Sequence, residues 1–432
     1  MNDGSMLLSP AGSSTRSGNN PSFVLGMLCF VYVLNFLDRQ LLSILAKPIQ
    51  DALQITDGQL GLISGLYFAM FYCFIAIPVG WVADRTSRVG VLSLACAIWS
   101  GATVACGMAA NYAQLVVARM VVGFGEAGGV PPSYAIITDT YPPGKRAAAL
   151  GIFNLGPAIG AAAGVAFGAA IAERFGWRIP FIAVGVIGIV TALAVWLVVR
   201  EPKRGATDAG GPAEAAGKAA FWPTVRMFVS NRVLMLAALG GGATQFVTYG
   251  LGNFAVLFLM REKGMELGEV AIWYALVLLI GMGGGMIVSG RVIDRMTRKS
   301  RTGYAIAPAL SLAVAMPFYL AFVWAPGWPL ALALLSVVMV FNYFYLSASV
   351  ALVQEEVQPN QRVLAGALLL LVMNFIGLGL GPTWVGFASD WFKAGGDAHG
   401  LQSALYTLTP FYIVAIGLFL ALARVIRKEE AA

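Results

Sequence analysis

Twelve apolar stretches of roughly 20 residues or more follow one another along this chain, and short polar segments separate them. A helix of about 20 apolar residues crosses the hydrocarbon core of a bilayer. Lipid offers no hydrogen-bond partners, so such segments must satisfy their own backbone groups as helices. Only 11% of the 432 residues are charged and 59% are hydrophobic, whereas soluble domains carry about 25% charged residues. The sequence therefore predicts an all-α integral membrane protein.

The apolar stretches fall into two sets of six. We expect an N-terminal tail over 1–20, a six-helix bundle over 21–200, a cytoplasmic linker over 201–226, a second six-helix bundle over 227–426 and a tail over 427–432. The expected spans are about 23–46, 57–83, 89–109, 112–138, 147–172, 179–199, 231–260, 268–293, 302–323, 328–354, 363–391 and 401–424.

Basic residues give the orientation. With the N-terminus inside, cytoplasmic tails, loops and helix ends hold 20 of the 28 Lys and Arg residues, six lie on the opposite side, and two lie within spans. Cytoplasmic loops of membrane proteins are enriched in Lys and Arg. We therefore expect both termini in the cytoplasm, and the net charge of +7 does not indicate a nucleic-acid partner.

The two sets of spans also form a sequence repeat. Two parallel six-helix halves with a site between them are a transporter architecture. At a constant offset of 210, Gly58, Gly80, Asp84, Arg85 and Arg88 match Gly268, Gly290, Asp294, Arg295 and Arg298; at an offset of 216, Asp139, Pro143, Arg146 and Ala149 match Glu355, Pro359, Arg362 and Ala365.

Four charges lie deep inside the expected spans, away from the span ends, and are expected to be buried. Arg119 and Glu126 share one face of the fourth span, and Asp38 and Arg39 lie in the first. An ionisable residue within a span costs several kcal/mol if it faces lipid, so these four must face protein or a water-filled cavity. Asp38 and Arg119 lie at matching depths, about 10–12 Å from the outer ends of their helices, so we expect them to pair.

The two carboxylates are the candidates for proton coupling. Burial favours the neutral form of a carboxyl group and a neighbouring guanidinium favours the charged form. A group under both influences, such as Asp38 or Glu126, can load and release a proton as the cavity opens to either side. The alternative is a pair of fixed ion pairs that hold the two helices together.

The second half has no charges at the matching positions. Glu126 corresponds to Asn342, Asp38 to Thr248 and Arg39 to Tyr249. A cavity with one charged wall and one aromatic wall suits an amphiphile with an anionic or zwitterionic head. We expect Arg39 and Arg119 to bind the head group, and Tyr249, Asn342 and Phe344 to contact the tail; packing within the half is the alternative role of these aromatic residues.

Charged residues at the inner loops predict a cytoplasmic gate. Arginines after the second span can bind carboxylates on the same side, and a carboxylate there can cap a neighbouring helix. A topology anchor is the alternative role. The gate residues are Asp84, Arg85, Arg88, Asp139, Arg146, Asp294, Arg295, Arg298, Glu355 and Arg362.

These residues resemble a known family. The stretch from Gly80 to Arg88, with its echo from Gly290 to Lys299, resembles the loop 2–3 and loop 8–9 motif of the major facilitator superfamily, and the stretch from Arg119 to Ala127 is similar to its fourth-helix motif. The fifth-helix glycine-proline motif is matched only in part, by Gly156 to Gly160.

The first span resembles one branch of that superfamily more closely. Asn35, Asp38 and Arg39, together with the charges of the fourth span, resemble the spinster branch. Members of this branch are implicated in exporting sphingosine phosphate and lysophospholipids. The resemblance implies that Asn35 belongs to the substrate site and that the substrate is a lysophospholipid or sphingolipid moved by alternating access.

Other chemistries are weakly indicated. The four cysteines all lie within spans without a C-x-x-C spacing, and His399 is the single histidine, so we expect neither a metal site nor a cofactor. No P-loop for ATP occurs, so energy must come from an ion or substrate gradient. The buried carboxylates favour protons, and sodium is the alternative ion. The alternatives are a drug or organic-anion carrier, an intramembrane enzyme and a passive channel. We expect a monomer in a bacterial inner membrane, with lipid substrate and protons as partners.

The orientation makes the first prediction. A single cysteine placed at Ala206 should react with an impermeant thiol reagent only from the cytoplasmic side, and one at Pro326 only from outside. The opposite labelling pattern would show that the chain is inserted the other way round.

Overall fold

Twelve long helical spans build the molecule, as the sequence predicts. The computed structural model describes residues 20–83, 85–202, 221–358 and 361–431. Over these residues twelve helices are long and apolar enough to cross a membrane. The linker predicted over 201–226 lies mostly outside the described residues, and its last residues begin helix α11 (Phe221–Ser230).

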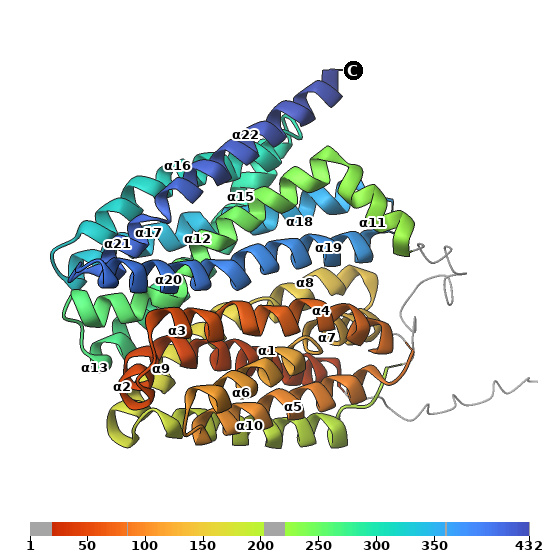
Figure 1. The fold of residues 1–432 in the computed structure, drawn as a ribbon. Coiled ribbons are helices and arrows are strands. Elements are labelled where there is room, and N and C mark those ends of the chain that lie inside the picture. The colour runs from red at the N-terminus through yellow and green to blue at the C-terminus, as the bar shows by residue number, and fades with distance from the viewer. Residues whose placement is uncertain (1–19, 84, 203–220, 359–360, 432) are drawn as a thin grey trace, which may run out of the picture.

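The N-terminal half contains the first six spans (Figure 1). A short helix, α2 (Ala46–Leu53), follows the first span. The spans are formed by α1 (Pro21–Ile44), by α3 (Asp57–Ser64) with α4 (Leu66–Ala83), by α5 (Arg88–Met108), by α6 (Tyr112–Glu126) with α7 (Val130–Thr140), by α8 (Pro143–Phe153) with α9 (Gly156–Phe175), and by α10 (Arg178–Val198).

The C-terminal half contains the other six and lies beside the first (Figure 1). Its spans are formed by α12 (Arg232–Glu262), by α13 (Leu267–Glu269), η1 (Val270–Tyr274), α14 (Ala275–Leu278), η2 (Leu279–Gly283) and α15 (Gly284–Thr297), by α16 (Gly303–Trp324), by α17 (Trp328–Asn342) with α18 (Phe344–Glu356), by α19 (Arg362–Asn374), η3 (Phe375–Leu380) and α20 (Gly381–Ala394), and by α21 (Gly400–Tyr406) with α22 (Thr409–Ala431).

The fourth and tenth spans are interrupted at equivalent places. Helix α6 ends at Glu126 before Gly128 and Gly129, and α17 ends at Asn342 before Tyr343. The repeat aligns these two end residues with each other. Because the repeat aligns the two breaks, they lie at the same depth in both halves. Interrupted helices are frequent at the binding sites of transporters.

Small residues let helices of one half approach closely. Gly156, Gly160, Gly164 and Gly168 recur every four residues along α9, where it packs on α1. A Cβ added at Gly160 would lie 2.4 Å from the carbonyl oxygen of Val33. Close backbone approach at small residues is a main source of helix association in membranes, and it fixes α1 and its charges against the bundle.

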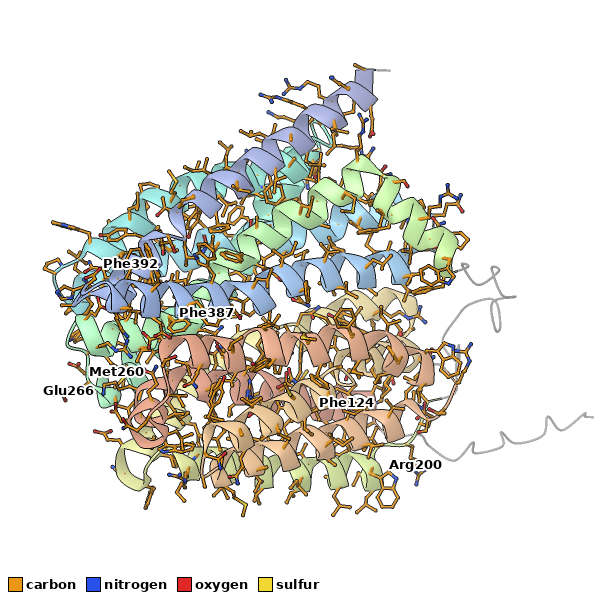
Figure 2. All side chains as sticks on the ribbon, in the orientation of Figure 1. Phe124, Arg200, Met260, Glu266, Phe387 and Phe392 are labelled. Carbon is orange, nitrogen blue, oxygen red and sulfur yellow. The ribbon has the colours of Figure 1, made fainter. Side chains whose placement is uncertain are left out.

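One end of the molecule fastens the two halves together. Helices α2, α3, α13 and α21 lie at this end, and Figure 2 places Met260 and Glu266 here and Arg200 at the opposite end. The basic-residue distribution predicts that this end faces outward, and we call it the outer end. Between described residues, the hydrogen bonds and ion pairs that join the halves all lie here, around α3 and α20.

The seam at Gly160 makes a stability prediction. Gly160→Ala should destabilise the protein by about 1–3 kcal/mol, because the added methyl group meets backbone that cannot move aside. Gly101→Ala in α5 is the matched control, since nothing lies within 4 Å of an added Cβ there. Thermal unfolding in detergent, followed by tryptophan fluorescence, should show a lower midpoint temperature for Gly160→Ala but not for Gly101→Ala. Equal midpoint temperatures would show that close packing at Gly160 does not stabilise the protein.

Candidate functional site

Four buried charges meet between α1 and α6. The Arg39 Nε donates a hydrogen bond to Glu126 Oε2 at 2.6 Å, and the Glu126 side chain is fully buried. This pair was not predicted, because the depth argument applied only to Asp38 and Arg119 and assigned no partner to Glu126. Glu126 is the last residue of α6, so its carboxylate lies at the break in the fourth span.

The second pair is the expected one but it is looser. Arg119 Nη1 lies 3.8 Å from Asp38 Oδ2, and both residues are at least 97% buried. Neither oxygen of Asp38 accepts a hydrogen bond from a described residue, and Nε and Nη1 of Arg119 donate none. Helices α1 and α6 thus exchange two ion pairs. One is short, although Glu126 Oε1 has no partner among the described residues, and the other is long and leaves both oxygens of Asp38 unsatisfied.

Aromatic rings enclose the two arginines. The Arg39 guanidinium lies 4.7 Å from the ring centre of Tyr72 and 5.1 Å from that of Phe36. Phe68 is shared, because its ring centre lies 5.2 Å from Arg39 and 5.1 Å from Arg119. A cation over an aromatic face is stabilised by about 0.5–2 kcal/mol, most where water is excluded.

Sequence reasoning missed this cage. Phe68 and Tyr72 lie on α4, four residues apart, and so share one helix face. That spacing, in a span next to the charges, is the signal that was available. A Cβ at Gly123 would lie 2.6 Å from the carbonyl oxygen of Phe68, so the glycine between Arg119 and Glu126 lets α4 approach α6.

The predicted substrate residues do not all lie together. Asn35 is buried on α1 one turn before Asp38, and its Oδ1 has no partner among the described residues. Tyr249 of α12 is half-buried and interacts electrostatically with Arg39 across the two halves. These two residues extend the charged cluster toward the C-terminal half.

The other two predicted contacts lie within the C-terminal half. Asn342 is fully buried, and its Oδ1 accepts a hydrogen bond from the Tyr412 hydroxyl of α22 at 3.1 Å. Phe344 is 4% exposed and stacks on Phe341 with ring centres 5.9 Å apart. In this conformation both side chains take part in packing rather than facing Arg39.

At the inner end the two halves carry equivalent ion pairs. Arg88, at the start of α5, binds Asp139 of α7. In the C-terminal half Arg301 binds Glu356 at 2.6 Å. The constant offsets of the repeat match Arg88 with Arg298 and Asp139 with Glu355, whereas the ion pair is made by Arg301 and Glu356, close by in the sequence. Glu355 accepts instead from the Tyr304 hydroxyl.

The remaining predicted gate residues have local roles. The Arg85 guanidinium carbon lies 3.9 Å from the ring centre of Trp81. Arg146 donates a hydrogen bond to the Tyr141 carbonyl, and Arg362 donates one to the Gln354 carbonyl. Asp294, Arg295 and Arg298 lie at the C-terminal end of α15, where the structure gives them no ion pair with a described residue. Asp84 lies outside the described residues.

Two glutamates that the sequence analysis overlooked accept hydrogen bonds at the same end, one at the start of α5 and one in the turn before α16. Glu201 accepts from the Ser87 hydroxyl and from the backbone N–H of Arg88 and Val89, at the start of α5. Glu430 accepts from the Ser300 hydroxyl and the Arg301 N–H in the other half. Glu201 follows the sixth span of the first half and Glu430 lies at the C-terminal end of the sixth span of the second half, so their positions are similar in the two halves.

Asp57 was also missed. It opens the second span and is 1% exposed, so the expectation that only four charges are buried in the spans is wrong at this position. Its partners lie in both halves, at the outer end.

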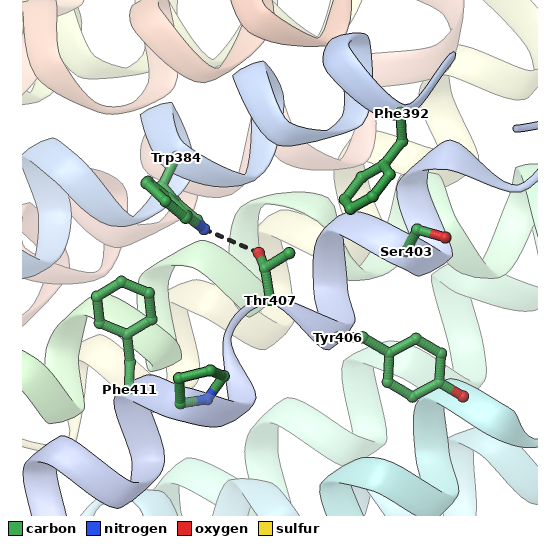
Figure 3. A pocket seen from close by; sticks show the side chains of 7 residues that line it. Trp384, Phe392, Ser403, Tyr406, Thr407 and Phe411 are labelled. Carbon is green, nitrogen blue, oxygen red and sulfur yellow. Dashed lines mark hydrogen bonds between the residues drawn. The ribbon is translucent and has the colours of Figure 1, made fainter. Parts of the chain in front are cut away.

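An apolar hollow lies away from the charges. It measures about 570 Å³ and lies between α20 and the break between α21 and α22, where Trp384 Nε1 donates to Thr407 Oγ1 at 2.8 Å (Figure 3). Trp384, Phe392 and Phe411 supply much of its lining. No ionisable group other than a tyrosine lines it, so it is not a coupling site.

Comparison with known proteins identifies the family. The family model of the Major Facilitator Superfamily matches residues 28–382. The chain belongs to the Major Facilitator Superfamily. A bacterial homologue of the human lysosomal transporter Spinster, solved in an inward-facing, unoccupied conformation, is 31% identical with a TM-score of 0.87, covering 96% of this chain and 99% of that chain.

Curated relatives agree with the assignment. Spinster homolog 3 of Danio rerio is 25% identical over 432 residues, covering 94% of this chain and 85% of its own length. An MFS-type efflux pump of Mycolicibacterium smegmatis is 32% identical over 412 residues, covering 94% of each chain. This superfamily member is therefore a spinster-type transporter, an integral multi-pass membrane protein, and not an enzyme.

Proposed function

We propose that the protein is a proton-coupled secondary transporter that moves an amphiphilic lipid, of lysophospholipid or sphingolipid type, by alternating access. The observation that carries the proposal is the loose pair between Asp38 and Arg119 beside the tight pair between Arg39 and Glu126. The single-chain carrier would act in the bacterial inner membrane, with protons as the coupling ion.

Asp38 is the proposed first proton acceptor. Its buried oxygens accept no hydrogen bond from described residues, and a buried carboxylate without such bonds is costly. A proton removes that charge and leaves Arg119 without its partner. Arg119 is then available to an anionic head group, whose oxygens can take the place of the carboxylate.

Glu126 and Arg39 form the second proposed coupling step. They are joined by a short charge-assisted hydrogen bond, which is stronger than the contact between Asp38 and Arg119. A head group that reaches Arg39 must compete with Glu126, and protonation of Glu126 releases the arginine. Tyr249 of the other half interacts electrostatically with Arg39. A change in the partner of Arg39 can therefore alter the contact between the two halves.

The lipid substrate is proposed from the asymmetry between the halves. The charges lie on α1 and α6. In the opposite half Tyr249 interacts with Arg39, and Asn342 and Phe344, at or near the position matching Glu126, are neutral and pack within their own half in this conformation. A site with a few polar groups on one wall and apolar side chains on the other suits an amphiphile. The resemblance to the spinster branch supports the same substrate class.

The second candidate is a drug or organic-anion carrier. The name of the Mycolicibacterium smegmatis relative, an efflux pump, favours it. The same buried arginines would bind a compact anion, and the same carboxylates would couple it to protons. The two candidates differ in whether affinity depends on the length of an apolar tail.

The coupling proposal predicts the behaviour of two neutral variants. In proteoliposomes, Asp38→Asn and Glu126→Gln should each lose stimulation of lysophospholipid uptake by a pH gradient, because neither amide side chain takes up a proton. Arg119→Lys should also lower uptake, since an ammonium group cannot reproduce the planar fork of a guanidinium.

Asp51→Asn is the matched control for these variants. Asp51 is exposed and pairs with Lys47 at the outer end, so its neutralisation should leave gradient-driven uptake unchanged. Full pH stimulation in both Asp38→Asn and Glu126→Gln would show that the two carboxylates only hold the helices together.

The lipid proposal predicts a dependence on chain length. Each buried methylene contributes about 0.8 kcal/mol, so two should tighten binding roughly tenfold until the cavity is filled. Tyr249→Ala should weaken long-chain lysophospholipids more than short ones, whereas Arg119→Ala should weaken both alike. Isothermal titration with a chain-length series measures this, and an affinity independent of length would favour the small-anion carrier.

A further inference from the structure

Asp57 holds a buried charge cluster at the outer end. Its carboxylate accepts hydrogen bonds from Arg261 Nη1 at 2.8 Å, Arg261 Nη2 at 3.0 Å and Gln50 Nε2 at 2.7 Å. It also accepts from the Ser389 hydroxyl at 2.6 Å and from Lys393 Nζ at 2.5 Å. Both oxygens are therefore saturated, unlike those of Asp38.

The cluster crosses between the halves. Asp57 and Gln50 belong to the N-terminal half, whereas Arg261, Ser389 and Lys393 belong to the C-terminal half. Arg261 also donates to Gln50 Oε1 at 2.8 Å. One carboxylate thus holds two cations that lie on the opposite half and that repel each other.

A second carboxylate, on the C-terminal half, binds the backbone of the N-terminal half. Asp390 of α20 accepts from the backbone N–H groups of Asp57 and Gly58, at 3.1 and 2.8 Å. These are the first residues of α3, and a helix N-terminus favours a negative charge. Two aspartates and two basic residues balance each other, so the closed cluster carries no net charge.

Backbone contacts seal the seam below the cluster. A Cβ at Gly61 would lie 2.5 Å from the carbonyl oxygen of Pro382, and one at Gly386 would lie 2.3 Å from that of Asp57. Phe387 of α20 lies along the same seam (Figure 2), its ring 3.1 Å from a Cβ at Gly58. Helices α3 and α20 therefore touch without space for water between them.

The repeat does not duplicate this device. At the equivalent position the second half has Leu267 in place of Asp57, although Gly268 has a carboxylate nearby, with Glu173 oxygens 3.2 Å from an added Cβ. The charged fastening is therefore single, and it lies between α3, α12 and α20. Because one cluster of hydrogen bonds and ion pairs joins the halves at this end, its interactions can break together when the halves separate.

We propose that Asp57 is the outer gate residue of the transport cycle, holding the outer side closed through Arg261 and Lys393 until the halves rock apart. The inference rests on the alternating-access part of the proposed function. On opening, each charge of the cluster passes from a protein partner to water, so closure is reversible. Removal of the Asp57 charge leaves the partly exposed cations Arg261 and Lys393 without the buried carboxylate that holds them together, so their repulsion favours separation of the halves.

Spin-label distances test the gate without any substrate. The four native cysteines are replaced, and labels are placed at the exposed outer residues Ala110 and Ala398, or at the exposed inner residues Lys145 and Val363. Pulsed electron resonance then measures outer and inner distances in the full chain in lipid nanodiscs. An outward-open state lengthens the outer distance and shortens the inner one.

Asp57→Asn and Arg261→Gln should both raise the ratio of outward-open to inward-open molecules by about tenfold or more. Asp51→Asn, which removes an exposed carboxylate at the same end, should leave the ratio unchanged. Because Arg261→Gln keeps Asp57 and Lys393 paired, it keeps the test available if Asp57→Asn does not fold.

The outcomes separate the gate from the proposed function. Two distance populations in the wild type, with no shift in a folded Asp57→Asn or Arg261→Gln protein, would overturn the gate and leave alternating access intact. A single wild-type population under all conditions, including saturating lysophospholipid and both low and high pH, would contradict alternating access and the gate with it.

Discussion

The exchange of two ion pairs between α1 and α6 is the interaction on which the rest of this structure depends. Charges at membrane depth are tolerated only when they face protein and each other. Arg39 binds Glu126, Arg119 approaches Asp38, and Phe68 lies against both guanidinium groups. The glycine seam of α9 packs α1 against the bundle, and the close approach at Gly123 packs α4 on α6, which places Phe68 beside both arginines.

The two pairs differ in a way that bears on mechanism. The pair of Arg39 and Glu126 is joined by a short hydrogen bond but leaves Glu126 Oε1 without a partner among the described residues, whereas both oxygens of Asp57 at the outer end are saturated. A loose pair with unsatisfied atoms, such as Asp38 and Arg119, is open to a proton or a substrate anion. We infer that the molecule separates the two tasks, with fastening at the outer end and exchange of partners in the interior.

Hydrophobicity made the fold readable from the sequence, because lipid demands long apolar helices and the two halves repeat. Matching depths also predicted that Asp38 meets Arg119. The pairing of Arg39 with Glu126 was not predictable, since it depends on how two helices are rotated toward each other. Asn342 aligns with Glu126, yet it turns toward Tyr412, because packing within a half decides where a neutral side chain points.

Sequence alignment also misplaced a conserved role within the repeat. Arg301 and Glu356 carry the ion pair that Arg88 and Asp139 carry in the first half. A constant offset matches sequence positions only, and it does not find a pair formed by neighbouring residues on both sides of the contact. Asp57 escaped notice for another reason: it opens a span, where a charge usually faces water, and only the docking of α20 and α12 buries it.

Proton flux driven by the substrate tests the central claim most directly. Proteoliposomes without an initial pH gradient, loaded with a pH-sensitive dye, receive lysophosphatidylcholine, whose head group does not titrate near neutral pH. The account predicts a change in luminal pH that requires the protein and that a protonophore abolishes. Transport of the lipid with no change in luminal pH would contradict coupling through Asp38 and Glu126.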